Sequence, residues 1–223
     1  MPPLLSYLAM ISSWLGGSEF WIKCWPCLFG AATLIVTCLI TAELGGKKFA
    51  QFLAGLGLLT GAYVRMHFLF QPNFLDVFFW TLTVYCLMRY INDKQSKFLY
   101  AFIISLALGC WSKYSIVFFA ASLLLALLIS KHRKIFLEKK FYTAALVGLL
   151  IIIPNVGWQY QHNWPLIHHM EELQETQLKF ISPSGFIKDQ FMMLLALYLY
   201  GPAVYYGSLD NLNGVLLVSP GYS

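Results

Sequence analysis

Charged residues are scarce in this chain of 223 residues. Aspartate, glutamate, lysine and arginine together make up 11% of it, whereas hydrophobic residues make up 59% and aromatic residues 17%. The mean hydropathy is +0.65. Soluble domains carry about 25% charged residues, so this composition excludes a soluble core and indicates a helical protein that crosses a membrane several times. At this length we expect about seven transmembrane helices plus interfacial helices.

The chain also lacks the marks of an exported or redox-active protein. Residues 4–15 follow no basic region and precede no small-residue cleavage site, which argues against a signal peptide. This apolar segment is too short to span a bilayer, so we expect an interfacial or partial helix there. Cys24 and Cys27 have redox spacing, but no βαβ pattern surrounds them. We therefore interpret the five cysteines as small buried hydrophobic residues, in preference to a thioredoxin-like or metal site.

Acidic residues are fewer than basic ones. The positions of the basic residues show whether this excess of positive charge indicates nucleic-acid binding or membrane topology. The formal net charge is +5, which alone would suit a nucleic-acid-binding protein. However, the basic residues gather in alternate short connections between apolar segments, as the positive-inside rule describes. We therefore expect no nucleic-acid partner, and we expect these connections to be cytoplasmic. They contain Lys47, Lys48, Arg89, Lys94, Lys97, Lys131, Arg133, Lys134, Lys139 and Lys140.

Seven apolar segments are candidates for membrane spans. They run over residues 20–42, 49–68, 74–90, 98–110, 115–129, 141–156 and 186–206. The connections around 67–73, 111–115 and 157–185 then face the extracytoplasmic side. Aromatic and amphipathic content in residues 158–184 predicts a second interfacial segment. The sequence therefore predicts an all-α integral membrane protein, a multi-span helical bundle, followed by a tail of unclear structure over residues 207–223.

The longest apolar stretch contains a single charge. Between Lys97 and Lys131, only Lys113 is charged. One helix over this stretch would be about 50 Å long, well beyond a hydrocarbon core of about 30 Å, so we expect the chain to turn back near Lys113. An ammonium at membrane depth costs roughly 3 kcal/mol on insertion scales and is seldom placed there without a partner or a polar cavity. Lys113 is therefore a candidate for a site at the membrane surface.

Several short motifs together resemble one enzyme family. In chain order they are Ala42-Glu43-Leu44-Gly45-Gly46, Phe68-Leu69-Phe70-Gln71-Pro72 with Asp76 and Phe79-Trp80, Ser112-Lys113-Tyr114-Ser115, and Pro154-Asn155 with Trp158-Gln159, His162 and Trp164-Pro165. Their order and spacing are similar to those of bacterial glycosyltransferase family 39, the dolichyl-phosphate-mannose-protein mannosyltransferase-like group. The resemblance covers roughly Pro2 to Ile187.

This resemblance implies a GT-C fold, with a catalytic cavity at the extracytoplasmic face of a bacterial inner (plasma) membrane. Such an enzyme would transfer a hexose or related sugar from a polyprenyl-phosphate-linked donor to a lipid, glycan or protein acceptor. Members usually hold a catalytic acid just before an element whose end Pro2-Pro3-Leu4 matches. We therefore expect residues 1–206 to form a partial GT-C transmembrane domain whose catalytic acid lies upstream of Met1, and we expect the chain as given to be inactive.

Five residues are candidates for the site. Asp76 matches the family's second acidic position, although the helix dipole also explains an acid at a helix N-terminus. Lys113, Arg65, His67 and Tyr114 lie in or near the connections predicted to be extracytoplasmic, and we expect them to bind substrate. Lys113 is expected at the phosphate of the lipid carrier. For the two cations, snorkelling toward lipid headgroups is the alternative.

The sequence implies no specific cofactor and leaves a divalent metal open. His168, His169 and Glu172 have helical spacing suited to metal ligation, but without a fourth ligand we favour the solvated polar face of an interfacial helix. Aromatic residues near the predicted interfaces fit a membrane belt, with stacking on a sugar ring as the alternative. These residues are Trp111, Trp158 and Trp164.

A non-catalytic function stays open beside the enzyme. A membrane protein that binds or transports lipid phosphates could use the same hairpins, with Lys113 holding its cargo without chemistry. An acidic loop after a further apolar span upstream of Met1 would favour the glycosyltransferase.

Overall fold

The computed structural model describes residues 3–60, 63–176, 182, 184–188 and 191–192. Within these residues every regular element is a helix, so the prediction of an all-α protein is confirmed. The predicted span 186–206 lies mostly outside the described residues, and the tail 207–223 lies wholly outside them.

The helices correspond closely to the apolar segments. Three of them, α2, α5 and α8, are long and apolar enough to cross a membrane, and α1, α6 and α7 are shorter apolar helices. In chain order the elements are α1 (Leu4–Trp14), α2 (Glu19–Glu43), α3 (Lys48–Thr60), α4 (Tyr63–Met66), α5 (Pro72–Asp93), α6 (Ser96–Ser112), α7 (Ser115–Ile129), the 3-10 helix η1 (Arg133–Leu137), α8 (Lys139–Gln161) and α9 (Pro165–Thr176).

The predicted span 49–68 is described only in part. α3 covers Lys48–Thr60 and α4 is one short turn, Tyr63–Met66, whereas residues 61–62 lie outside the described residues. A single membrane span over residues 49–68 therefore stays a prediction.

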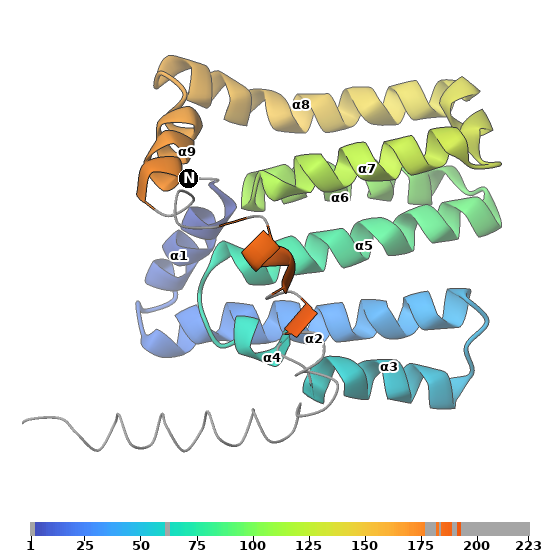
Figure 1. Ribbon diagram of the computed structural model, residues 1–223, viewed down its shortest axis with the longest axis horizontal. Helices are drawn as coiled ribbons and strands as arrows, with labels where there is room; N and C mark the ends of the chain where they lie inside the picture. The colour runs from blue at the N-terminus through green and yellow to red at the C-terminus, as the bar shows by residue number, and fades with distance from the viewer. Residues whose placement is uncertain (1–2, 61–62, 177–181, 183, 189–190, 193–223) are drawn as a thin grey trace, which may run out of the picture.

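The six main helices, α2, α3, α5, α6, α7 and α8, alternate in direction, so their connections gather at two ends of the bundle (Figure 1). At one end, Glu43 forms an ion pair with Arg89 at 2.7 Å, and the Tyr90 hydroxyl donates a hydrogen bond to Glu138. These contacts join the three connections that carry the basic residues. The structure thus confirms that the basic connections share one end, which we call the basic end.

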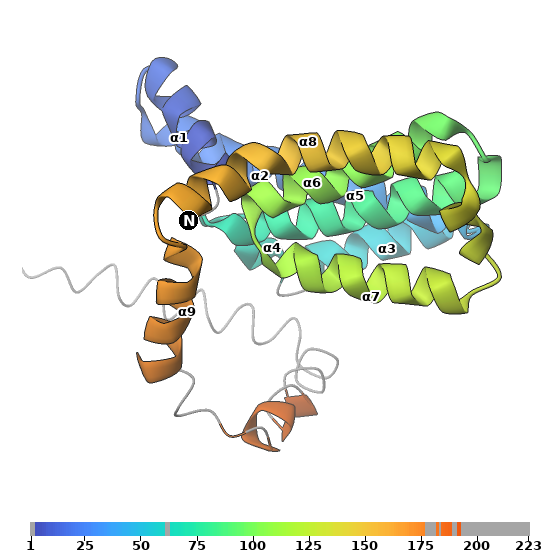
Figure 2. The ribbon, with the colours of Figure 1, turned by 90° about the horizontal axis from the view of Figure 1, so that it is seen from above.

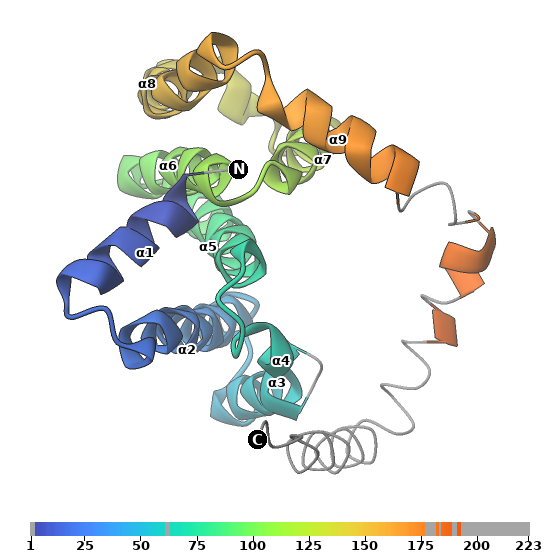
Figure 3. The same cartoon turned by 90° about the vertical axis from the view of Figure 1, so that its left-hand side faces the viewer.

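The opposite end carries short helices that lie across the bundle. There α6 turns into α7, and α1, α4 and α9 are found at this same end (Figures 1 and 3). Figure 2 shows α1 and α9 leaving the bundle in opposite directions. The helices α1 and α9 fall within the predicted interfacial segments 4–15 and 158–184. Their position in the membrane interface stays a prediction.

The core lies around α5 and α6. α5 packs against both α2 and α6, and α6 packs against α8. Two buried clusters lie along these helices, one that includes Phe74 and one that includes Leu99 and Phe102. A hydrogen bond of 2.8 Å between Thr83 and Ser105 joins α5 to α6. By contrast, large apolar side chains on α2, α3, α7 and α8 are exposed, which suits helices that face lipid.

The Ala42–Gly46 motif ends α2 at the basic end. Gly45 adopts φ +86°, a conformation that favours glycine, and the Gly46 backbone N–H donates to the Thr41 carbonyl at 2.8 Å. Glu43 also accepts a hydrogen bond of 2.9 Å from Asn92 of α5. This motif therefore clamps α2 onto α5, far from the α6–α7 turn.

The prediction that the cysteines are buried is confirmed only in part. All five are free thiols; Cys86 is buried, and Cys24, Cys38 and Cys110 are partly buried. Cys27 is exposed, so the prediction of burial is wrong there. It lies on α2 at the edge of a cavity, where a small apolar side chain is tolerated as it is in a core.

Candidate functional site

The α6–α7 turn confirms the prediction that the chain folds back near Lys113. α6 ends at Ser112, Lys113 is extended (φ −163°, ψ 137°), and α7 begins at Ser115. The Ser112 hydroxyl donates to the Gly109 carbonyl at 2.7 Å, and the Lys113 N–H donates to the same oxygen at 2.9 Å. These two bonds satisfy the end of α6 and hold the base of the Lys113 side chain in place.

Lys113 is paired with an amide and not with a carboxylate. Its ammonium donates a hydrogen bond of 2.9 Å to Asn73 Oδ1, at the start of α5. No ion pair of Lys113 is found among the described residues, and its side chain is only partly buried. Asn73 carries no charge, Asp76 is close enough for an electrostatic interaction with the ammonium, and the ammonium has further protons with which to bind an anion.

Asp76 lies beside this lysine and is 8% exposed. Its Oδ2 accepts a hydrogen bond of 2.8 Å from the Ser115 hydroxyl at the start of α7, whereas Oδ1 has no hydrogen-bond partner among the described residues. Because α5 begins at Pro72, Asp76 lies in the second turn. The helix dipole acts mainly within the first turn, so it does not explain the position of Asp76.

Tyr114 joins the turn to α8. Its hydroxyl donates to Asn155 Oδ1 at 2.8 Å and accepts a hydrogen bond from Gln159 Nε2 at 2.6 Å. Both amides are buried, and Gln159 Oε1 has no partner in the described part of the chain. We call the whole group the polar cluster; it consists of Asn73, Asp76, Lys113, Tyr114, Ser115, Asn155 and Gln159.

Four members of the polar cluster have no role predicted from the sequence. Asn73 falls only in a predicted connection, and Ser115, Asn155 and Gln159 fall only within motifs. A usable signal exists for the last two, because they are four residues apart in the apolar helix α8 and so share one face. Buried amides on one face of such a helix require partners on a neighbouring helix.

His67 and Arg65 lie apart from the polar cluster. His67 is on the loop side of α4, where Nδ1 contacts the Tyr63 carbonyl at 3.0 Å and the ring packs against Gly30 of α2. Arg65 is exposed and forms no ion pair with any described residue. No hydrogen bond within the described residues links either side chain to Lys113. The structure therefore brings together Asp76, Lys113 and Tyr114, but not Arg65 or His67.

The remaining candidates have local partners. His168 Nδ1 lies 3.5 Å from Glu171 Oε2 on the exposed surface of α9, and the described residues contain no group of three or more metal-ligating side chains. Trp111 donates to the Ile151 carbonyl at 3.0 Å and stacks on Tyr7, so it holds α6 to α8 and α1. Packing between helices at this end of the bundle therefore accounts for the position of Trp111.

A comparison with protein families gives the class of this protein. The family model described as dolichyl-phosphate-mannose-protein mannosyltransferase matches residues 1–158. The chain belongs to this family. Comparison with curated proteins and with solved structures gave no match.

The range that matches the mannosyltransferase family includes most of the polar cluster. The matched residues include Asn73, Asp76, Lys113 and Asn155 and end one residue before Gln159. The predicted resemblance beyond residue 158, as far as Ile187, stays a prediction. Together with the apolar helices, membership makes this chain an integral membrane protein of a glycosyltransferase family.

Proposed function

We propose that this chain belongs to an enzyme that transfers a sugar from a polyprenyl-phosphate-linked donor to a lipid, glycan or protein acceptor. The polar cluster would be part of the donor site, at the extracytoplasmic face of a bacterial plasma membrane. Family membership supports the class of reaction. The position of the cluster, at the end opposite the basic connections, supports the face.

Lys113 carries this proposal. It is a cation at the end of an apolar helix, held at its base by the α6 C-terminus and bound through its ammonium to an uncharged amide. A lipid phosphate at the membrane surface would lie at this depth, and a hydrogen bond to a charged group contributes about 1.5–3 kcal/mol. Lys113 would therefore bind the donor's phosphate and stabilise the charge that remains on the carrier after transfer.

Asp76 and Tyr114 have different parts in this proposal. Asp76 is the candidate second acid, and its carboxylate would accept a hydrogen bond from a sugar or acceptor hydroxyl. Tyr114 is held by α8, so it would position the turn that carries Lys113. Arg65 and His67 stay predictions as substrate-binding residues. The identity of the catalytic acid and the inactivity of the 223-residue chain also stay predictions.

Charge substitution at Lys113 tests the donor site. In the protein expressed from its full reading frame, we expect Lys113→Gln to weaken binding of a polyprenyl-phosphate sugar by about 10- to 100-fold, the equivalent of one charged hydrogen bond. Lys113→Glu should abolish binding and transfer, because a carboxylate repels the phosphate. The measurements are donor binding and sugar transfer in membranes that contain equal amounts of each variant.

Lys131→Gln is the matched control, because Lys131 is exposed at the basic end. It should leave both binding and transfer unchanged. If Lys113→Glu binds donor as tightly as the parent, Lys113 only anchors the turn to headgroups and the proposal fails. Donor binding through Lys113 without any transfer by the parent protein would instead support a lipid-phosphate-binding or transport protein.

A further inference from the structure

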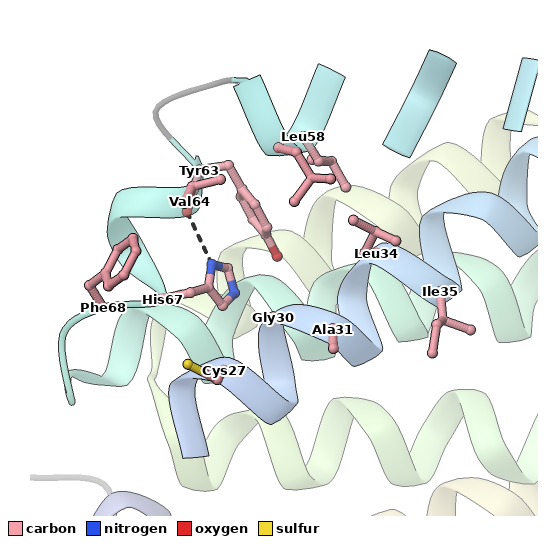
Figure 4. A pocket seen from close by; sticks show the side chains of 11 residues that line it. Cys27, Gly30, Ala31, Leu34, Ile35, Leu58, Tyr63, Val64, His67 and Phe68 are labelled. Carbon is pink, nitrogen blue, oxygen red and sulfur yellow. Dashed lines mark hydrogen bonds between the residues drawn. The ribbon is translucent and has the colours of Figure 1, made fainter. Parts of the chain in front are cut away.

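A second site lies between α2, α3 and α4. A cavity of about 410 Å³ is lined by eleven residues from these three helices and from the two residues that follow α4 (Figure 4). Among them are Leu34, Leu58, Tyr63 and His67. In the described part of the chain, no lysine, arginine, aspartate or glutamate lines this cavity. Its outer wall includes strongly exposed apolar side chains such as Ile35 and Phe68, so the cavity opens toward the lipid-facing surface. An occupant would therefore enter from the bilayer and carry no net charge.

His67 supplies the polar feature of this cavity. The residue is 8% exposed, and its Nε2 has no hydrogen-bond partner among the described residues. Its Nδ1 lies 3.0 Å from the Tyr63 carbonyl, an oxygen that can only accept, so Nδ1 carries the proton. In the neutral ring Nε2 is then a hydrogen-bond acceptor. A ligand that satisfies it must donate a hydrogen bond.

Tyr63 places a second polar atom close by. Its ring packs against the His67 ring with centroids 4.4 Å apart. The Tyr63 hydroxyl lies near Thr33 but makes no hydrogen bond of ordinary geometry with a described residue. Figure 4 shows this hydroxyl on the same side of the His67 ring as Nε2. A hydroxyl group fits here, because it can donate to His67 and accept from Tyr63.

The depth of the cavity fits such a ligand. α4 lies at the same end of the bundle as the polar cluster, so His67 is near the predicted membrane surface, while Leu34 and Leu58 lie deeper along α2 and α3. We propose that this cavity binds an uncharged lipid of the diacylglycerol type, with its free hydroxyl at His67 and one acyl chain along α2 and α3. The site is separate from the donor site proposed above.

Photo-crosslinking tests this site on the unmodified protein. The probe is dioleoylglycerol with a diazirine in one acyl chain, used with the full-length protein in phosphatidylcholine nanodiscs. We expect crosslinks to concentrate on peptides of α2, α3 and α4, and unlabelled dioleoylglycerol to compete. Its 3-acetyl ester lacks the hydroxyl, so it should compete about fivefold less well, as expected for one lost hydrogen bond.

The outcomes that contradict the site are distinct. Crosslinks spread equally over the exposed faces of α7 and α8 would mean ordinary bilayer lipid and no site. Equal competition by the acetyl ester would overturn the role of the hydroxyl. Stronger competition by a long-chain polyprenol than by dioleoylglycerol would overturn the diacylglycerol assignment.

Variants give a second measurement. His67→Leu should lower crosslinking about fivefold, because leucine offers no acceptor. His162→Leu is the matched control, since His162 makes the same kind of Nδ1 contact, 2.9 Å to the Trp158 carbonyl, but is exposed directly after the end of α8. Lys113→Gln should leave crosslinking unchanged although it weakens donor binding. Loss of crosslinking in either control would show that the effect of His67→Leu is not specific to the cavity.

Discussion

At the scale of single residues, the chemistry of this protein depends on partners far away in the chain. Lys113 and Asn73 are 40 residues apart, Asp76 and Ser115 are 39 apart, and Tyr114 and Gln159 are 45 apart. Each pair joins a residue of the α6–α7 turn to another helix. A polar side chain in an apolar bundle needs such a partner, because an unpaired buried group costs about 1–3 kcal/mol.

Tyr114→Phe tests the link between the turn and α8. We expect it to destabilise the protein by about 2 kcal/mol, because the buried amides of Asn155 and Gln159 lose their shared partner. The measurement is the thermal unfolding of the detergent-purified protein. Tyr142→Phe is the control, since Tyr142 is exposed, and it should leave the melting temperature within error. An equal effect of the two substitutions would contradict the role given to Tyr114.

At the scale of elements, close helix packing sets the position of the turn. Gly109 lies one turn before Lys113, and a Cβ added there would clash with Ile116 Cδ1 and lie 3.3 Å from Phe79 Cβ. Both neighbours are buried, and Ile116 is fully so. The absence of a side chain at Gly109 therefore lets α6 approach α5 and α7 where the polar cluster forms.

Gly109→Ala should destabilise the protein, by about 1–3 kcal/mol, because overpacking in a filled core forces neighbours to shift. Gly57→Ala is a matched substitution within a helix, since an added Cβ at Gly57 meets nothing within 4 Å. It should leave stability unchanged or raise it slightly, as alanine favours helix. The measurement is the thermal unfolding of the two variants. If Gly109→Ala is as stable as the parent, Gly109 is not tightly packed against Ile116 and Phe79.

At the scale of the whole molecule, the two ends of the bundle differ in chemistry. One end gathers the basic connections and the ion pair of Glu43 with Arg89. The other end holds the polar cluster, the cavity near His67 and the crossing helices α1 and α9. A bilayer would separate such ends into two compartments, and the positive-inside rule predicts that the basic end is cytoplasmic.

Cysteine labelling tests this orientation. In a background without native cysteines, we expect Arg133→Cys to be labelled only from the cytoplasmic side and Glu175→Cys only from the opposite side. Both residues are exposed, so a failure to label would not reflect burial. Labelling of both positions by an impermeant reagent from one side of intact cells would contradict the predicted topology.

The sequence by itself determined the class of fold, the turn at Lys113 and the common end of the basic connections. These follow from hydropathy, from the length of a bilayer-spanning helix and from charge placement, which are local properties. Only the tertiary structure decided that Asp76, Lys113 and Tyr114 share a site while His67 faces another cavity. Helix packing makes that choice, because it depends on contacts between segments about 40 residues apart that no local pattern records.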